Sequence, residues 1–415
     1  IPVVSPGLSY TGSTASGIGN AVAIKTTGED IGKAFAQNYR DNAMYTSFLI
    51  NVSAAQTTGD YFLAFLDSTL SAANFRARTF IKSSGTGFKI GISKSGTVTA
   101  AGTGVITLGD ANTGISVGGN STVGGTSTGQ ITLGAATLAD NVTLTVGGGA
   151  YAANITLSTV TGTANGLSSD FTINTTGTVS VGAVGTDIGT VTVTRSGGTA
   201  FNSTVSAATI TLSDSTAASS ITFSGNVTAT SGLSAAGTAN AYNVIFNGAS
   251  NTIASTTTLS NTGTVTLVSG SGSSTFSGGV TATTQSQVNI GGTINSSNAT
   301  ISIGDSNTPT VLTANTTISG NTSGNITLGG TVNGAYTLDV NTTGTTTFSG
   351  VIGGSTPLTS VTTNTGGTVA INTTAISTTG AQTFNENVTL GADVTLTSSS
   401  SGNISFAGTI ESNSL

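Results

Sequence analysis

The sequence contains no His and no Cys, so the remaining candidates for acid–base chemistry are carboxylates, Lys, Tyr and Arg, and the long C-terminal region contains ten carboxylates. Asp110, Asp140 and Asp170 are equally spaced along the chain, so a repeating fold with turns of matching length would stack them, as a glycosidase requires. The alternative is that each acid is a turn residue whose carboxylate accepts local backbone N–H groups. Arg195 is the only basic residue of this region, and we expect no catalytic site. The ten acids are Asp110, Asp140, Asp170, Asp187, Asp214, Asp305, Asp339, Glu386, Asp393 and Glu411.

Metal-binding motifs are missing from the sequence. Neither a D-x-D-x-D-G loop nor a GGxGxD nonapeptide series occurs, and these are the two strong sequence signatures of calcium binding. We predict no cofactor.

Threonine side chains could order water on a flat face, as ice binding requires, if Thr-x-Thr recurred at one position in every turn of a repeating fold. The runs at 143–145, 190–194 and 395–397 are not evenly spaced, so the sequence predicts an irregular outer Thr surface. Asn-x-Ser/Thr sequons arise at random from this composition and predict no modification. Examples are Asn141, Asn154, Asn325 and Asn387.

Charge and hydropathy argue against two classes of partner. The formal charge of −6 and the pI of about 4.3 argue against nucleic acid, whose phosphates are bound by clustered Lys and Arg. No run of about 18 apolar residues occurs, so no helix is expected to span a membrane. The start, IPVVSPGLSY, lacks the features of a signal peptide. Any signal peptide is therefore expected to have been removed or to lie outside this sequence.

The distribution of charge divides the chain in two. Eight of the nine Lys and Arg residues precede residue 95, and so do half of the aromatic residues. We therefore predict a small domain with an aromatic core over residues 1–97 and a different architecture over residues 98–415.

Four segments of the first region alternate apolar with polar residues between Gly, Ser or Asn, which is typical of antiparallel strands with one buried face. A further segment, EDIGKAFAQNYRDN (29–42), fits a short helix or an irregular strand equally well. The four predicted strands are MYTSFLINVSA (44–54), DYFLAFLDS (60–68), NFRARTFIKSS (74–84) and GFKIGISKS (87–95).

The first 97 residues resemble laminin-G-like or concanavalin-like jelly-roll modules of secreted bacterial proteins. The resemblance rests on NVSAAQTTGDYFLAFLDS, FRARTFIKSSGTGFKIGISKSGT and the opening VVSPGLSYTGSTASGIGNAVAI. Such sandwiches have more strands than fit here, so the module is either half a sandwich, completed by the following region or another chain, or a trimmed cap.

The same resemblance implies a glycan-binding role and a calcium site built from backbone carbonyls and one carboxylate. Asp60 and Asp67 are the metal candidates, and the alternative is that both are solvated loop acids. Tyr39, Tyr45 and Tyr61 are the aromatic candidates for sugar contact, and the alternative places them in the core or at its rim.

From residue 98 onward, short motifs repeat. Near copies occur as GVITLG (104–109), GQITLG (129–134) and GNITLG (324–329), and a second set shares Thr-Phe-Ser-Gly. Strands of four to six residues between Gly, Asn and Ser turns predict a right-handed parallel β-solenoid, with apolar residues inside and Thr outside. The irregular spacing favours turns of about 20–25 residues.

This array resembles the repeats of filamentous-haemagglutinin-like and autotransporter-type adhesins, notably in TTGAQTFNENVTLGADVTLTSSSSGNISFAGTIES (378–412). We therefore predict an all-β protein, with a small antiparallel jelly-roll-like module over residues 1–97 followed by a β-solenoid over residues 98–415.

The composition and the two resemblances favour an extracellular structural or adhesive protein of a bacterial surface, without catalysis. Solenoid ends carry unpaired backbone groups, and a surface with few charges opposes association little. The expected partner is another copy of the chain, joined end to end or by strand donation from the incomplete module. One alternative is a glycan-binding module on a passive stalk, and another is an enzyme acting on polysaccharides.

Overall fold

The computed structural model describes residues 3–4, 21–22, 60–66, 75–84, 87–93, 104–109, 114–125, 128–149, 152–164 and 166–412. The chain divides into two compact units, Ile1–Gly104 and Val105–Leu415. All regular secondary structure in these ranges is β, which confirms the all-β prediction. The described part of the chain contains no helix with the length and hydropathy needed to cross a bilayer.

The described residues of the first unit form two small antiparallel sheets. One joins β3, β4 and β5 in that order, with Tyr61 opposite Phe80 and Ile81 opposite Ile90. These strands confirm the predictions for 60–68, 74–84 and 87–95. The predicted strand at 44–54 and the helix or strand at 29–42 lie outside the described residues, and the jelly-roll module stays a prediction. The strands of this unit are β1 (Val3–Val4), β2 (Ala21–Val22), β3 (Asp60–Leu66), β4 (Phe75–Ser84) and β5 (Gly87–Ser93).

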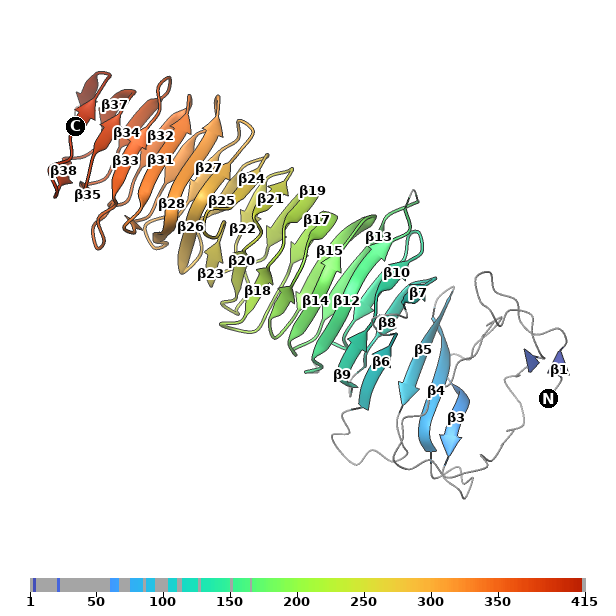
Figure 1. The fold of residues 1–415 in the computed structure, drawn as a ribbon. Coiled ribbons are helices and arrows are strands. Elements are labelled where there is room, and N and C mark those ends of the chain that lie inside the picture. The colour runs from blue at the N-terminus through green and yellow to red at the C-terminus, as the bar shows by residue number, and fades with distance from the viewer. Residues whose placement is uncertain are drawn as a thin grey trace. The chain divides into compact units, whose positions relative to one another are not determined.

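The second unit is a parallel β-solenoid of about 14 turns, visible in Figure 1 as a stack of strands running from teal to red. A typical turn contributes to three parallel sheets, which we call faces A, B and C in the order in which the chain visits them. Short or absent corners let β12, β14, β26 and β28 run from face A into face B. In the same way, β17 and β19 run from face B into face C.

The strands that enter or form face A are β6 (Gly104–Leu108), β9 (Thr128–Leu133), β12 (Ile155–Gly162), β14 (Val179–Val184), β16 (Thr199–Phe201), β18 (Ser220–Phe223), β20 (Asn243–Phe246), β23 (Thr264–Thr266), β26 (Gln287–Asn295), β28 (Thr310–Asn321), β30 (Val332–Asn333), β35 (Ala375–Thr378) and β38 (Thr395–Ser398). Face B adds β7 (Ile115–Val117), β10 (Ala136–Leu138), β17 (Val205–Leu212), β19 (Val227–Ala235), β21 (Ser250–Ile253), β24 (Ser273–Phe276), β31 (Thr337–Thr342), β33 (Ser360–Thr363), β36 (Gln382–Phe384) and β39 (Ile404–Phe406). Face C adds β8 (Ser121–Val123), β11 (Thr143–Val146), β13 (Ser169–Asn174), β15 (Ile188–Arg195), β22 (Thr257–Leu259), β25 (Val280–Ala282), β27 (Ile301–Ile303), β29 (Ile326–Leu328), β32 (Thr345–Phe348), β34 (Thr368–Ile371), β37 (Asn387–Leu390) and β40 (Ile410–Ser412).

Register is kept from turn to turn although turn length varies. On face A, Ile131 pairs with Ile155, which pairs with Val179 at an equal sequence step. The next step, from Val179 to Thr199, is shorter. The predicted turn length of about 20–25 residues is therefore confirmed for this face, and the corners absorb the variation.

The core follows from the alternation of buried and more exposed residues along most strands of the solenoid. Buried and partly exposed residues alternate in β13, β31 and β35, so the apolar set of all three faces points inward. Beneath face A, Phe201, Phe223 and Phe246 stack with ring centroids 5.0 and 5.2 Å apart. Stacked aromatic rings of this kind add to the stability that burial provides.

The corner between faces C and A contains polar side chains that are nevertheless buried. Ser196 and Ser215 share a hydrogen bond of 3.0 Å between their hydroxyls. The Gln285 amide donates to the Asn261 carbonyl at 3.1 Å, and the Thr308 hydroxyl donates to the Gln285 carbonyl at 2.8 Å. We call this set the corner ladder, and it satisfies backbone groups where the chain changes direction. Its members are Thr175, Ser196, Ser215, Asn261, Gln285 and Thr308.

Candidate functional site

The carboxylates do not form the stack that equal sequence steps suggested. Asp170 lies on face C in β13, and its partner one turn earlier is Thr143 rather than Asp140. Its carboxylate accepts the backbone N–H of Thr190 at 2.8 Å. Asp140 lies in the corner before β11, and Asp110 lies outside the described residues. The equal spacing therefore does not pair Asp140 with Asp170, because the turn that joins them is shorter than the spacing of the acids.

Arg195 and Asp214 form an ion pair at the corner between faces C and A. The Arg195 Nε lies 3.8 Å from an Asp214 oxygen. The same carboxylate accepts the Thr238 hydroxyl at 3.0 Å and the Asn240 amide at 3.2 Å. With its oxygens engaged by neighbouring turns, Asp214 links corners of the solenoid.

Metal ligands are not gathered at any point of the described chain. No group of three or more His, Cys, Asp or Glu residues occurs among the residues that the structure describes. Asp60 begins β3, and Asp67 lies outside the described ranges, as do Tyr39 and Tyr45. The metal candidates of the sequence stay a prediction.

Glu386 is the acid whose surroundings are least expected. Glu386 lies at the corner between β36 and β37 and is only 3% exposed. Burial raises the pKa of the carboxyl, and the nearby Thr363 hydroxyl offsets only part of that. Neither carboxyl oxygen makes a well-formed hydrogen bond. Nothing in the sequence distinguished Glu386 from the other scattered acids.

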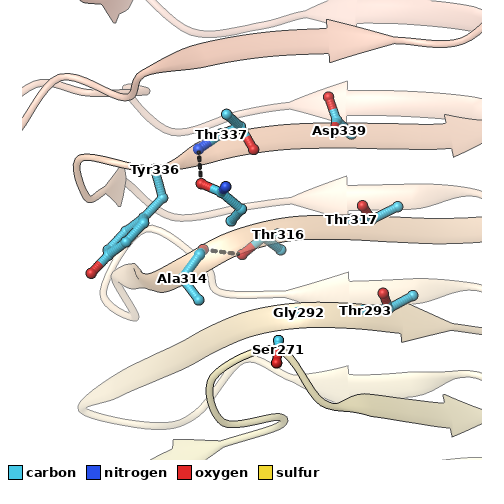
Figure 2. A pocket seen from close by; sticks show the side chains of 10 residues that line it. Ser271, Gly292, Thr293, Ala314, Thr316, Thr317, Tyr336, Thr337 and Asp339 are labelled. Carbon is cyan, nitrogen blue, oxygen red and sulfur yellow. Dashed lines mark hydrogen bonds between the residues drawn. The ribbon is translucent and has the colours of Figure 1, made fainter.

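A shallow groove of about 500 Å³ follows the corner between faces A and B. Figure 2 shows Tyr336 at one end and Thr293, Thr317 and Asp339 in a row at the other. This row follows strand register, since Thr293 pairs with Thr317 and Thr317 with Asp339. Tyr336 is 38% exposed. An open ring beside hydroxyls and one carboxylate can contact a polyol, and the sequence analysis did not identify this groove.

On the outer surface of face C, one column of hydroxyl residues is more regular than the prediction of an irregular Thr surface suggested, although the position two residues before it contains Asp170 and Gly232 as well as Thr. Eleven consecutive turns place a Thr or Ser at the same register position, and from the second of these turns onward both of its neighbours are buried. The sequence steps are uneven, short from Thr192 to Thr211 and long from Thr145 to Thr172, which hid the alignment. We call this set the face C ladder, and its members are Thr122, Thr145, Thr172, Thr192, Thr211, Ser234, Thr258, Thr281, Ser302, Thr327 and Thr347.

The wider comparison adds no relative to this description. No family model matches the chain, and neither a curated protein nor a solved structure matches it.

Proposed function

We propose that the chain is an extracellular structural and adhesive protein, a subunit of a self-assembling filament or surface fibre, without catalysis. The observation that carries this proposal is the solenoid itself, a parallel stack of about 14 turns. Successive strands are joined by backbone hydrogen bonds along the stack. Such a ladder suits a load-bearing rod, because repeat stability grows by adding turns and the neighbours share each interface.

The partner that we propose is a second copy of the chain. The last described strands, β39 and β40, have a pairing partner only in the turn before them. Ile404 and Ile410 are 38% and 49% exposed there. A further turn, supplied by a second copy or by residues that follow this sequence, would cover both side chains and pair the open strand edge. The low content of charged residues, 6% of the chain, leaves little electrostatic repulsion between copies.

Electron microscopy of the purified chain at several concentrations tests this proposal. We expect regular fibres that lengthen with concentration. An Ile404→Lys and Ile410→Lys double variant should give isolated rods, because charge at an open edge opposes strand addition. The matched control is Thr327→Lys, on the side of the solenoid, which should still form fibres.

Monodisperse rods of a single molecule at every concentration would contradict self-assembly. The extracellular location has its own test, in which intact cells of the source organism are labelled with an antibody against the chain. Label that appears only after the cells are opened would contradict it.

Glycan binding is a second candidate function, and the Tyr336 groove favours it. An exposed aromatic ring at one end of the groove, with Thr293, Thr317 and Asp339 in a row at the other, offers one apolar surface and several hydrogen-bonding groups. On a glycan array, Tyr336→Ala should lose binding. Leu167→Ala is the matched control, because Leu167 is another exposed apolar residue, at 68%, and lies between β12 and β13. Equal binding by the Tyr336 variant and the wild type would exclude this groove.

A further inference from the structure

The Tyr336 groove is lined by one charged side chain, that of Asp339. Strand register places Asp339 in an outward column of face B, between Thr317 one turn earlier and Thr362 one turn later. From Ser250 to Ser405, every other member of this column is Ser or Thr. The groove therefore contains a single negative charge in a row that is otherwise made of hydroxyls.

The Asp339 carboxylate has no partner within the part of the chain that the structure describes. It makes no hydrogen bond and no ion pair with any described residue, and Arg195, the only basic residue of the solenoid sequence, pairs with Asp214 instead. Asp339 is half-buried, so water solvates its charge only in part. A ligand that brings a cation would supply the missing partner.

The rest of the groove suits a chain of sugar units. The hydroxyls of Ser271, Thr293 and Thr317 make no hydrogen bond within the described residues. Tyr336 lies three residues before Asp339, a distance of about 10 Å along an extended strand, and Figure 2 shows the ring and the carboxylate at opposite ends of the groove. A ligand that reaches both must therefore be longer than a single sugar.

Backbone hydrogen bonds hold the Tyr336 end of the groove in place. The Tyr336 N–H donates to the Gly334 carbonyl at 2.8 Å, and the Tyr336 carbonyl accepts the N–H of Thr359 at 2.9 Å. The Asn315 side chain accepts the N–H of Thr337 at 3.2 Å, drawn as a dashed line in Figure 2. Because these groups are fixed before a ligand arrives, little conformational entropy is lost on binding.

We propose that the Tyr336 groove binds an amino-sugar polymer whose amino groups are free and protonated. An ammonium group pairs with Asp339, a sugar ring covers Tyr336, and sugar hydroxyls exchange hydrogen bonds with Thr293 and Thr317. This amino-sugar site rests on the glycan-binding function proposed above, whose ligand it narrows to one chemical class. Asp339 repels an acidic glycan, and a neutral glycan leaves its carboxylate unpaired.

A basic peptide fits the groove less well. The strands that line the groove are paired on both sides, β28 with β26 and β31, and β31 with β28 and β33. No backbone edge is open there for an extended peptide to join. A polybasic segment would also find one carboxylate only, whereas the hydroxyls around Asp339 suit a polyol.

Isothermal titration calorimetry of the full chain with two hexasaccharides, one of glucosamine and one of N-acetylglucosamine, tests the proposal. At about pH 5.5, where amino groups are protonated and ordinary carboxylates are ionised, we expect the wild type to bind the glucosamine hexamer more tightly. Asp339→Asn should weaken that binding about tenfold, the loss expected for one charge-assisted hydrogen bond. The same variant should bind the acetylated hexamer as the wild type does, and Tyr336→Ala should weaken both.

Nonspecific attraction has to be separated from this site, because the chain has a formal charge of −6 and attracts any polycation. The matched control is Asp140→Asn, which removes one charge from an exposed residue outside the groove and should bind as the wild type does. Circular dichroism and the unfolding temperature establish that each variant is folded. If Asp339→Asn does not fold, Asp339→Thr, which continues the hydroxyl column, takes its place.

Equal weakening by the Asp140 and Asp339 variants would overturn the proposal, because the attraction would then be nonspecific. Equal affinity of the wild type for the two hexamers would overturn the preference for free amino groups and leave glycan binding intact. Absence of binding to both hexamers would also overturn the amino-sugar site, and the glycan array then decides whether the glycan-binding function fails with it. Displacement of the glucosamine hexamer by a lower concentration of oligolysine with equal charge would assign the groove to a basic peptide and overturn the proposal as well.

Discussion

Two columns of buried side chains inside the solenoid, one aromatic and one polar, are stabilised by different interactions. Beneath face A, Phe201 and Phe223 stack almost parallel, with an interplanar angle of 4°, and the column is stabilised by area and shape. A corner away, Ser196, Ser215 and Gln285 are equally buried, and this column depends on paired donors and acceptors. Strand register aligns both columns. A substitution in the aromatic column should destabilise the fold by leaving a cavity, and one in the polar column by leaving buried groups unpaired, so the two losses should differ in size.

The largest effect is expected in the aromatic column. Phe223→Ala removes the ring between Phe201 and Phe246 and leaves a cavity, so the free energy of unfolding should fall by about 3–5 kcal/mol. Urea unfolding followed by circular dichroism measures it. The neighbouring outward substitution, Thr222→Ala, should change the value by less than about 0.5 kcal/mol. Equal losses of unfolding free energy in the two variants would mean that the buried aromatic stack stabilises the fold no more than an outward Thr does.

The polar column should respond through its unpaired partners. Gln285→Met keeps the length of the side chain but removes the amide that donates to Leu259 at 2.7 Å and Asn261 at 3.1 Å. Leaving buried carbonyls short of donors should cost about 1–3 kcal/mol in the same urea experiment.

The control for this change is Gln287→Met, two residues further on in β26, where the amide is bound to the side chain of Asn289 and is only partly buried. This control should lose clearly less stability. If both variants lose the same free energy of unfolding, the hydrogen bonds of the corner ladder do not stabilise the fold specifically, and the contrast with the aromatic column is wrong.

Glu386 is a buried acid whose two carboxyl oxygens are unpaired, so its contribution to stability should depend on pH. Because burial raises the pKa of this carboxyl above its ordinary value of 4.5, the folded state prefers the protonated form. Below pH 4.5 the group is protonated in both states, and as pH rises through the raised pKa the wild type loses stability. Glu386→Gln should therefore be more stable than the wild type at pH 7 and equal to it at pH 4. Thermal unfolding at both pH values shows this.

An exposed acid provides the comparison. Glu411 is exposed on β40, so Glu411→Gln should leave the unfolding temperature at pH 7 unchanged. A wild type that keeps its full stability from pH 4 to pH 7 would show that the Glu386 carboxyl is better solvated than its burial indicates.

The sequence predicted the β class, the solenoid and the length of a turn, because alternation and Gly- or Asn-rich turns act locally. It did not reveal which residues stack on one another, because the corners differ in length and the sequence step between stacked residues on face C is therefore uneven. The Thr runs at 143–145 and 190–194 both contribute to the face C ladder, through Thr145 and Thr192. The alignment appears only when the strands are placed in register. In the sequence, Gln285 and Ser215 resemble exposed loop residues. They are buried because the corners of successive turns stack on one another.

The smallest effect is expected where asparagines at exposed corners connect one turn to the next. Asn325, which the sequence marked only as a random sequon, accepts the backbone N–H of Thr345 at 2.9 Å, and Asn154 and Asn387 do the same at 3.0 Å. Because water can replace an exposed acceptor, Asn325→Ala should cost only about 0.5–1 kcal/mol. Asn341→Ala, on the outside of β31 and without such a bond among the described residues, should cost less. Equal costs would mean that solvent satisfies the Thr345 amide fully, and that register is set by the interior columns alone.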